Sequence, residues 1–561
     1  MRRTTLGTVL AVLTLLAVAA GCGQASNPDP AAAPPGTVAQ GGRADLTVES
    51  EGTPRAGGKV VFGLAGETDG WNPATNRWGA SGYIVGFSIF DPIAAYDDAL
   101  VPRPYLARTI TPDATFTTWT IELRADVVFH DGTPVDAAAI AKNLDTQRSG
   151  GLTAETLSFI STVEVTDATH VKVTMTKPWS GFPNMLTSQV GAIASPAMLA
   201  GGAEASRHPV GSGPFRFVEW ETDKHLNVTK NEHYWRPGYP HLDDLEFRPL
   251  SDASARAAAL RAGDVNIIES ADPKVIRSFT EDAQKGPGGY QLFTDLKIDG
   301  PKIFLALNHA SPPFDDPLAR EAVAHAVDRG ALSEVAFEGV FPPIAGPFSE
   351  SSPWVSADVA VPAFDTARAK QLAQDYEKKH GAPLAFSLSL PSTTESAQIG
   401  QTLQQQFADA GIKVNLNGED AVALIVDIFA GKYEAGLFSL FSSPVIDTNY
   451  AFIAGPAKPI GQLSLNFARV SETDNAALIA AMDKARTTAD PAEQKAQYAI
   501  VQQEMAKNLG FVFLVRQTTA VIYDASVRGA KIYDLPGPDG EPVAHALART
   551  APFTFNLWVA E

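Results

Sequence analysis

Cysteine is almost absent from this chain of 561 residues, in which Cys22 is the only one. A single cysteine cannot close a disulfide within the chain, so the fold does not depend on an internal disulfide framework. Cys22 directly follows an apolar N-terminal run. That position explains the residue better than a redox role does.

Long apolar runs are also scarce. Residues 6–20 form an uncharged apolar run that follows Arg2 and Arg3. The run is too short to span a bilayer comfortably, and its basic start is typical of a secretory signal. We therefore expect 1–21 to be a signal peptide. No later run reaches the 18 or so apolar residues of a membrane span, so we do not expect the chain to form a transport channel.

The end of the apolar run, Ala19-Ala20-Gly21-Cys22, resembles the lipobox of bacterial lipoproteins, although Ala19 stands where a leucine is usual. The resemblance implies that Cys22 is lipidated and anchors the protein to the outer side of the cell membrane, in a periplasm or facing a cell wall. An ordinary secretory signal with Cys22 as a bystander is the alternative. Residues 22–57 are rich in Gly, Pro, Ala and Ser, which predicts a flexible tether.

Basic residues are fewer than acidic residues. The chain has 44 Lys and Arg against 63 Asp and Glu, a formal net charge of −19. Nucleic-acid binding needs a basic footprint, so this balance argues against a nucleic-acid partner. It is compatible with solubility beside a membrane and with a cationic or zwitterionic ligand.

Catalytic and metal-binding patterns are missing as well. His225, His233 and His241 are spaced by eight residues, which matches no known metal cage. Gly211-Ser212-Gly213 lacks the lysine of a phosphate-binding loop. His130 precedes an Asp-Gly turn, where a structural role is expected. The sequence therefore predicts no cofactor, no metal and no enzyme.

Strand and helix signals alternate through the remaining residues, which are too many for one compact core. Trp119, Ile121 and Leu123 alternate with polar residues as in a half-buried strand. The patterns predict strands at 59–64, 412–416, 510–515 and 520–523. They predict helices at 137–145, from Asp316-Pro317 to Gly330, around 399–410 with a stop at Gly411, and at 491–508. For the first of these helices, Thr133 is expected as the N-cap and Pro134 at the first helical position.

Four segments in order resemble the family of bacterial extracellular solute-binding proteins, family 5, which serve oligopeptide, dipeptide and nickel ABC importers. The most specific is Leu123-Arg124-Ala125-Asp126-Val127-Val128-Phe129-His130-Asp131-Gly132-Thr133-Pro134. The others are Phe90-Asp91-Pro92-Ile93 through Pro104-Tyr105-Leu106-Ala107, Gly211-Ser212-Gly213-Pro214-Phe215 through Asn231-Glu232-His233-Tyr234-Trp235, and Leu307-Asn308 with Pro313-Phe314-Asp315-Asp316 and Arg320-Glu321-Ala322.

The resemblance implies an α/β fold of two lobes, of the periplasmic-binding-protein class II type, with an extra domain inserted in lobe I. Lobe I would comprise 58–95, 210–303 and 511–561, the inserted domain 96–209, and lobe II 304–510. The implied function is capture of a peptide-like solute between the lobes by hinge closure. The implied partners are the permease and ATPase subunits of an ABC importer, with the binding protein itself a monomer.

The resemblance also implies where the solute binds. After the first strand it places Glu67, Trp71, Asn72 and Tyr83 at the cleft. In the second lobe it places Phe441, Ser443, Asp447 and Tyr450 there.

Many peptide-binding members carry an aspartate that holds the ligand amine where Ser443 or Pro444 stands here. An unpaired buried amine is costly. Asp447 or Glu67 would have to substitute, or the ligand is a modified peptide or another solute, such as a sugar or a nickel chelate. A further alternative is a signalling or cell-wall protein that kept the fold without transport.

Overall fold

The computed structural model describes residues 52–150, 154, 157–284, 289–294, 300–350, 352–440, 445–455, 466–547 and 553–560. The predicted signal peptide, Cys22 and most of the predicted tether lie outside the described residues. Phe441 and Ser443 also lie outside them. Residues from Val48 onward form one unit, in which each of three sheets builds its own core.

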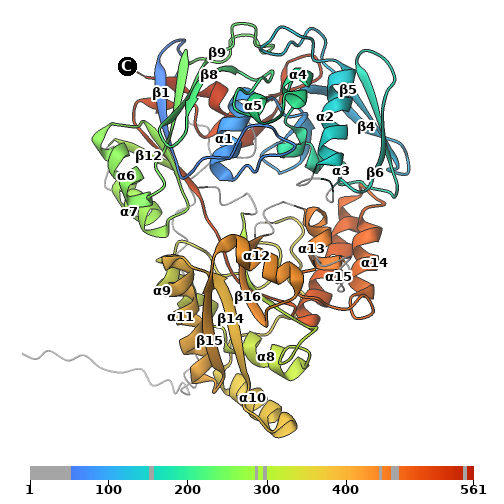
Figure 1. Ribbon diagram of the computed structural model, residues 1–561, viewed down its shortest axis with the longest axis vertical. Coiled ribbons are helices and arrows are strands. Elements are labelled where there is room, and N and C mark those ends of the chain that lie inside the picture. The colour runs from blue at the N-terminus through green and yellow to red at the C-terminus, as the bar shows by residue number, and fades with distance from the viewer. Residues whose placement is uncertain are drawn as a thin grey trace, which may run out of the picture. The chain divides into compact units, whose positions relative to one another are not determined.

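A mixed seven-stranded sheet forms the core of the first lobe (Figure 1), with the order β12-β18-β11-β1-β10-β9-β8. The central strand β1 is parallel to both of its neighbours, β10 and β11. Helices α6 and α7 bury apolar side chains against β11 and β18. The strands are β1 (Lys59–Leu64), β8 (Phe215–Glu221), β9 (His225–Lys230), β10 (Asp244–Pro249), β11 (Ile267–Ser270), β12 (Tyr290–Thr294) and β18 (Ala520–Asp524), and the helices are α1 (Ala80–Ile89), α6 (Ala253–Ala262) and α7 (Pro273–Gln284).

A separate antiparallel sheet, β4-β5-β7-β6, packs on helix α2 and has a core of its own. Trp119, Ile121 and Leu123 of β5 are buried and alternate with half-buried residues, as the sequence predicts. We call this sheet with its helices the inserted unit. Its elements are β4 (Ala107–Pro112), β5 (Thr118–Leu123), β6 (Ile160–Val165), β7 (His170–Met175), α2 (Ala137–Ser149), α3 (Phe182–Met185), η1 (Gln189–Gly191), α4 (Pro196–Ala200) and α5 (Gly202–Ser206).

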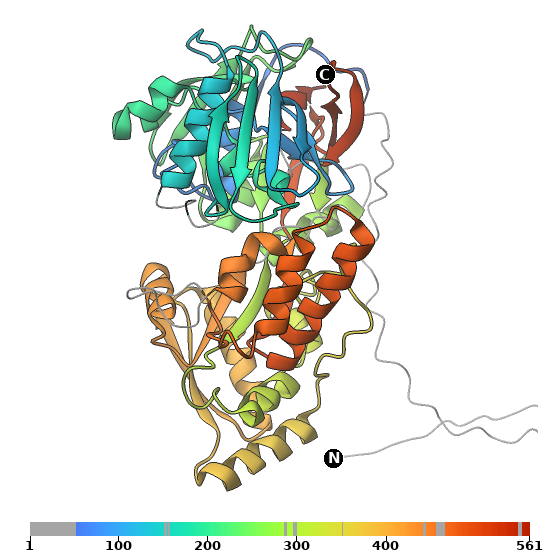
Figure 2. The same cartoon turned by 90° about the vertical axis from the view of Figure 1, so that its right-hand side faces the viewer.

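The second lobe is built on the five-stranded sheet β15-β14-β16-β13-β17. Helices cover both faces, with α8 to α11 on one side and α12 to α15 on the other (Figures 1 and 2). The strands are β13 (Lys302–Leu307), β14 (Ala385–Pro391), β15 (Lys413–Glu419), β16 (Ala435–Leu440) and β17 (Phe511–Arg516), and the helices are α8 (Pro317–Ala326), α9 (Arg329–Phe337), α10 (Thr366–His380), α11 (Thr394–Asp409), α12 (Ala421–Ala430), η2 (Ile446–Asn449), α13 (Tyr450–Ala454), α14 (Ala476–Ala485) and α15 (Pro491–Asn508).

Smaller pairs of strands complete the fold near the chain ends. The hairpin β20–β21 lies in the C-terminal segment, and β2 pairs with β3 just before the inserted unit. The remaining elements are β2 (Ala94–Tyr96), β3 (Pro102–Pro104), β19 (Val527–Arg528), β20 (Ile532–Pro536), β21 (Pro542–Leu547), η3 (Thr554–Asn556) and β22 (Trp558–Val559).

Two connections join the lobes, and their described residues contact one another. One lies between β12 and β13 and the other between β17 and β18, and both strand pairs β12–β18 and β13–β17 are antiparallel. The amide of Gln517 donates to the carbonyl of Pro301 at 2.7 Å. A Cβ on Gly300 would lie 2.6 Å from the Gln517 carbonyl oxygen, so glycine allows this close approach. The two connections therefore form one narrow hinge.

The domain boundaries expected from the sequence stay a prediction. Strand pairing nevertheless places β17 in the sheet of lobe II, beside β13. The division that we propose therefore returns to lobe I after Arg516 rather than at residue 511.

Most of the predicted elements are confirmed, but two helix ends are wrong. Helix α2 begins at Ala137 with Asp136 as its N-cap, because the Asp136 carboxylate accepts the Ala139 amide at 2.8 Å. Thr133 instead closes the turn of Asp131. Helix α8 ends at Ala326, and Gly330 lies in the first turn of α9.

The segment that follows β5, which carries the most specific family resemblance, connects the inserted unit to its surroundings. The Arg124 guanidinium is buried and donates to the carbonyls of Tyr105 (2.8 Å) and Gly537 (2.8 Å) and to neighbouring carbonyls of the β20–β21 turn. His130 Nε2 lies 3.0 Å from the Gly213 carbonyl, and burial lowers the pKa of His130 to about 4. These contacts are structural, as expected for His130.

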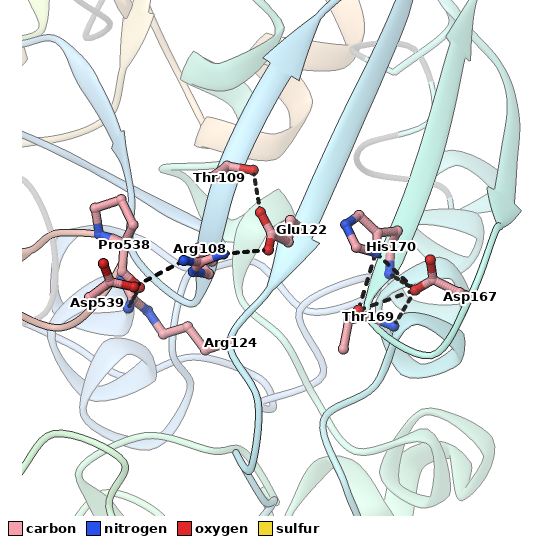
Figure 3. Close-up of polar contacts among 9 residues, drawn as sticks. All are labelled: Arg108, Thr109, Glu122, Arg124, Asp167, Thr169, His170, Pro538 and Asp539. Atoms are coloured by element: carbon pink, nitrogen blue, oxygen red, sulfur yellow. Dashed lines mark hydrogen bonds and ion pairs between the residues drawn. The ribbon is translucent and has the colours of Figure 1, made fainter.

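The outer face of the same sheet is polar (Figure 3). Arg108 lies between Glu122 (2.8 Å) and Asp539 (2.9 Å), so an exposed ion-pair chain also reaches the β20–β21 turn. At the β6–β7 turn, Asp167 accepts hydrogen bonds from Thr169 and lies 2.9 Å from His170 Nδ1. These pairs are exposed, so they contribute little to the stability of the sheet.

Candidate functional site

The two large sheets each have an edge where the carboxyl ends of parallel strands meet. In lobe I these are the ends of β1 and β11, and in lobe II they are the ends of β14 and β16. Ligands of open α/β sheets bind outside such edges. The helices α7 and α11 begin there, after β11 and β14 respectively.

An electrostatic interaction relates the two edges. Loss of surrounding water raises the pKa of Glu395, in the first turn of α11, and the negative charge of Asp272 raises it further. Asp272 immediately precedes α7, and its carboxylate accepts the Val275 amide at 2.9 Å. A carboxylate beside the carboxyl-end edge of lobe I therefore interacts electrostatically with one beside that of lobe II.

The loop after β1 carries the first group of predicted binding residues. Glu67 is half-buried, and both of its oxygens are bonded within the protein. Trp220 Nε1 donates to Oε1 at 2.9 Å, and the Asp223 amide donates to Oε2 at 2.7 Å. Asn72 closes its own turn by accepting the Ala74 amide at 3.0 Å. Both polar side chains thus stabilise the loop in this conformation.

Aromatic rings tie this loop to helix α1. Trp71, which is 2% exposed, packs on Trp78 at 6.4 Å and on Trp220 at 5.8 Å between ring centroids. Tyr83 meets Trp78 edge-on at 6.1 Å. Burial raises the pKa of the Tyr83 hydroxyl, which accepts the Gln189 amide at 3.5 Å. Glu67, Trp71 and Tyr83 therefore belong to one cluster, which resembles a packed wall more than an open pocket.

Asp447 belongs to a second group, which it forms with side chains that the sequence did not single out. It is 6% exposed, and its Oδ1 pairs with Nε of Arg486, a residue that is itself buried. Its Oδ2 accepts Trp179 Nε1 at 2.6 Å. Both oxygens of Asp447 are therefore engaged by protein donors.

Tyr450 lies on the same arginine. The Arg486 guanidinium is 4.2 Å from the centroid of the Tyr450 ring and 4.1 Å from that of Phe159, so it lies between two aromatic faces. Burial and the nearby charge of Asp483 raise the pKa of Tyr450 to about 12. Its hydroxyl is therefore neutral at physiological pH.

The predicted site residues that the structure describes thus fall into two groups, one on each lobe. The printed sequence carried no local signal for Trp179, Arg486 or Trp220, because their partners are 39 to 268 residues away. The first group contains a buried donor without a partner, because Trp71 Nε1 makes no hydrogen bond within the described structure.

A cavity of about 300 Å³ lies inside lobe II, between residues 343–362 and α15. Its walls are mostly apolar. Arg329 lines it and donates from Nε to the Phe513 carbonyl at 2.7 Å. None of the predicted ligand-binding residues lines this cavity, so we place the candidate site at the two carboxyl-end edges instead.

The described residues show no metal-binding cluster. Within them, no three His, Cys, Asp or Glu side chains are grouped closely enough to hold a metal ion. The helices among them are also each too short or too polar to cross a membrane.

Comparison with known proteins gives consistent matches. A model of the family described as bacterial extracellular solute-binding proteins, family 5 (middle region), matches residues 101–455. The glutathione-binding protein GsiB of Pectobacterium atrosepticum is 29% identical over 420 residues, which cover 71% of this chain and 77% of that protein.

Solved structures match over nearly the whole described chain. The binding protein AgaA from A. tumefaciens R10, solved with agropinic acid, is 26% identical with a TM-score of 0.74, covering 90% of this chain and 99% of AgaA. NikA from Brucella suis, solved with Fe(III)-EDTA, has a TM-score of 0.76 at 21% identity, covering 90% of this chain and 100% of NikA, and shows the fold alone.

Proposed function

Because the chain belongs to family 5 of the bacterial extracellular solute-binding proteins, we propose that it captures a small peptide-like solute between its lobes and delivers it to an ABC importer. The observation that carries this proposal is the pair of carboxyl-end edges, joined by a single narrow hinge. Asp272 and Glu395, one beside each edge, interact electrostatically and support this placement of the site.

Hinge closure is the mechanism that this arrangement supports. The chain passes between the lobes where β12 leads to β13 and where β17 leads to β18, so a rotation of the lobes would be taken up by few backbone angles. A solute that contacts both edges binds the closed form more tightly, so binding shifts the population toward closure. The importer would then recognise the closed form.

The peptide-like ligand class rests on a relative. GsiB is a glutathione-binding protein, and glutathione is a tripeptide. The acidic net charge of −19 is compatible with a solute that carries an ammonium group. Asp272 and Glu395 lie where such a group would be attracted.

A solute without a free amine is the second candidate. Glu67 and Asp447, the carboxylates expected to hold a ligand amine, are both bonded to protein donors. A blocked or modified peptide would leave no charge unpaired if neither carboxylate turned toward it.

We also propose that the chain is exported and tethered as a monomer. Residues 1–21 would be removed as a signal peptide, Cys22 would carry the lipid, and 22–57 would link it to the lobes. Cys22→Ala is expected to move the protein from the membrane fraction to the soluble fraction. Unchanged membrane retention would refute the lipid anchor.

A matched pair of ligands tests the capture function. Purified protein is titrated calorimetrically with glutathione and with N-acetylglutathione, followed by a panel of free and N-acetylated di- and tripeptides. Binding of the free forms alone supports the first candidate, and equal binding of both forms supports the second. No heat and no thermal shift with any of these solutes would overturn the peptide-like ligand class.

A further inference from the structure

A second set of contacts joins the lobes, away from the hinge. Residues 179–180 lie between β7 and α3, and they contact lobe II at Asp447, Arg486 and Gln494. Trp179 is 1% exposed, and its indole N–H reaches Asp447 Oδ2 at 2.6 Å.

Ser180 adds three hydrogen bonds to these contacts. Its amide donates to the Arg486 carbonyl at 2.9 Å, and its hydroxyl donates to the Ala485 carbonyl at 3.2 Å. The same hydroxyl accepts Gln494 Nε2 at 3.2 Å. Phe159 of the inserted unit adds an aromatic face to Arg486 and meets Tyr450 edge-on at 6.0 Å.

The charged pair at the centre of these contacts belongs entirely to lobe II. The side chains of Asp447 and Arg486 are 5% and 4% exposed. A buried ion pair stabilises only where further hydrogen bonds satisfy its remaining donors and acceptors. Trp179 supplies one of these from the other lobe, and separating the lobes would leave Asp447 Oδ2 without that donor.

We propose that Trp179 and Ser180, together with Asp447, Arg486 and Gln494, form a latch that holds the lobes together without any solute. On this proposal Asp447 is not a ligand-binding residue. Its carboxylate orients Arg486 and receives the inserted unit, and the latch sets how often the empty protein opens. The inference deepens the proposed closure mechanism, but its test uses no solute.

The backbone beside the latch is shaped for this close approach. A Cβ on Gly181 would lie 3.0 Å from Asp447 Oδ2 and 3.4 Å from Trp179 Nε1. An alanine there would crowd the Asp447 carboxylate by a few tenths of an ångström, so we expect it to weaken the latch. Gly181→Ala therefore tests the latch without replacing any of its side chains.

The test measures the distance between the lobes in the empty protein. Lys142 of α2 and Lys370 of α10 are exposed, and Cys substitutions there carry spin labels in a full-length chain with Cys22→Ala. Trp179→Phe removes the indole donor and keeps an aromatic ring. Trp119→Phe is the matched control, because Trp119 contacts the same Phe182 ring at 5.7 Å and its Nε1 has no partner in the described structure.

The latch predicts one narrow distance for the unsubstituted pair and for Trp119→Phe. Trp179→Phe, Ser180→Ala and Gly181→Ala should each add a longer, broader population. For Trp179→Phe the ratio of open to closed forms should rise about tenfold, because a hydrogen bond to a charged group is lost. Distance distributions in all three variants that match the control would overturn the latch, whatever solute the protein binds.

Discussion

Two buried aspartates each receive an indole N–H, one within lobe I and one where the inserted unit meets lobe II. Asp91 accepts Trp235 Nε1 at 3.0 Å, and Asp447 accepts Trp179 Nε1 at 2.6 Å. Both carboxylates are buried. They differ in the rest of their surroundings.

Neutral donors surround Asp91, whereas a cation pairs with Asp447. The Tyr234 hydroxyl and the Ser212 hydroxyl each donate to Asp91 at 3.0 Å. Burial outweighs these bonds and raises the pKa of Asp91 to about 7. Asp447 instead pairs with Arg486. The comparison teaches that the joint within lobe I is sensitive to pH, while the joint between the lobes depends on charge pairing.

The largest effect is expected from removing one partner of the Asp447–Arg486 ion pair. Asp447→Ala leaves the Arg486 guanidinium buried without a counter-ion, which should reduce the free energy of unfolding by about 3–5 kcal/mol. Urea denaturation checks this. The double variant Asp447→Leu/Arg486→Met is the control, since removing both charges should recover most of the loss. A loss below about 1 kcal/mol in the single variant would show that the pair is not charged and buried.

The Asp91 site should give the next largest effect, which appears as a change in the stability of the fold with pH. The pKa of Asp91 is raised from 3.8 to about 7 on folding, so its protonation stabilises the fold fully below pH 3.8. This contribution is lost as pH rises through 7, on the order of 1 kcal/mol per pH unit within that window. Asp91→Asn cannot titrate, so the stability of the unsubstituted protein relative to this variant should fall between pH 5 and 7.5. Parallel stability profiles for the two proteins would contradict the raised pKa.

A smaller effect is expected at the joint with the C-terminal hairpin. Arg124→Met removes buried hydrogen bonds to the Tyr105 and Gly537 carbonyls and should lower the free energy of unfolding by about 2 kcal/mol. Arg108→Ala removes an ion pair to Asp539 of the same hairpin and another to Glu122 of β5 (Figure 3), and should leave the denaturation midpoint unchanged. Equal losses in the two variants would show that burial does not decide the strength of this joint.

Helix starts and helix lengths that depend on neighbouring residues could be predicted from the sequence. Asp316-Pro317 caps and starts α8, and α15 runs from Pro491 to Asn508 as its pattern predicts. Thr133 failed as a cap because Asp136, three residues later, offers a carboxylate at the correct place. Gly330 failed as a stop because Asp328 caps a new helix just before it.

Long-range partners were beyond local reasoning. The sequence offers Asp447 or Glu67 only as a substitute for the family's usual amine-binding aspartate, and that role stays a prediction. The structure adds that Asp447 meets Arg486 and, across the lobes, Trp179, 268 residues away. Nothing in the spacing of these residues marks them as neighbours, because the contact depends on how two separately folded sheets meet.

The position of β18 has a consequence for the order of folding. This strand lies between β12 and β11 in the seven-stranded sheet, although it follows all of lobe II in the chain. Lobe II needs only residues up to Arg516 to complete its sheet. Lobe I, in contrast, cannot close its sheet until Ala520–Asp524 has emerged from the ribosome or the export channel. Lobe I can therefore complete its sheet only after all of lobe II has been made.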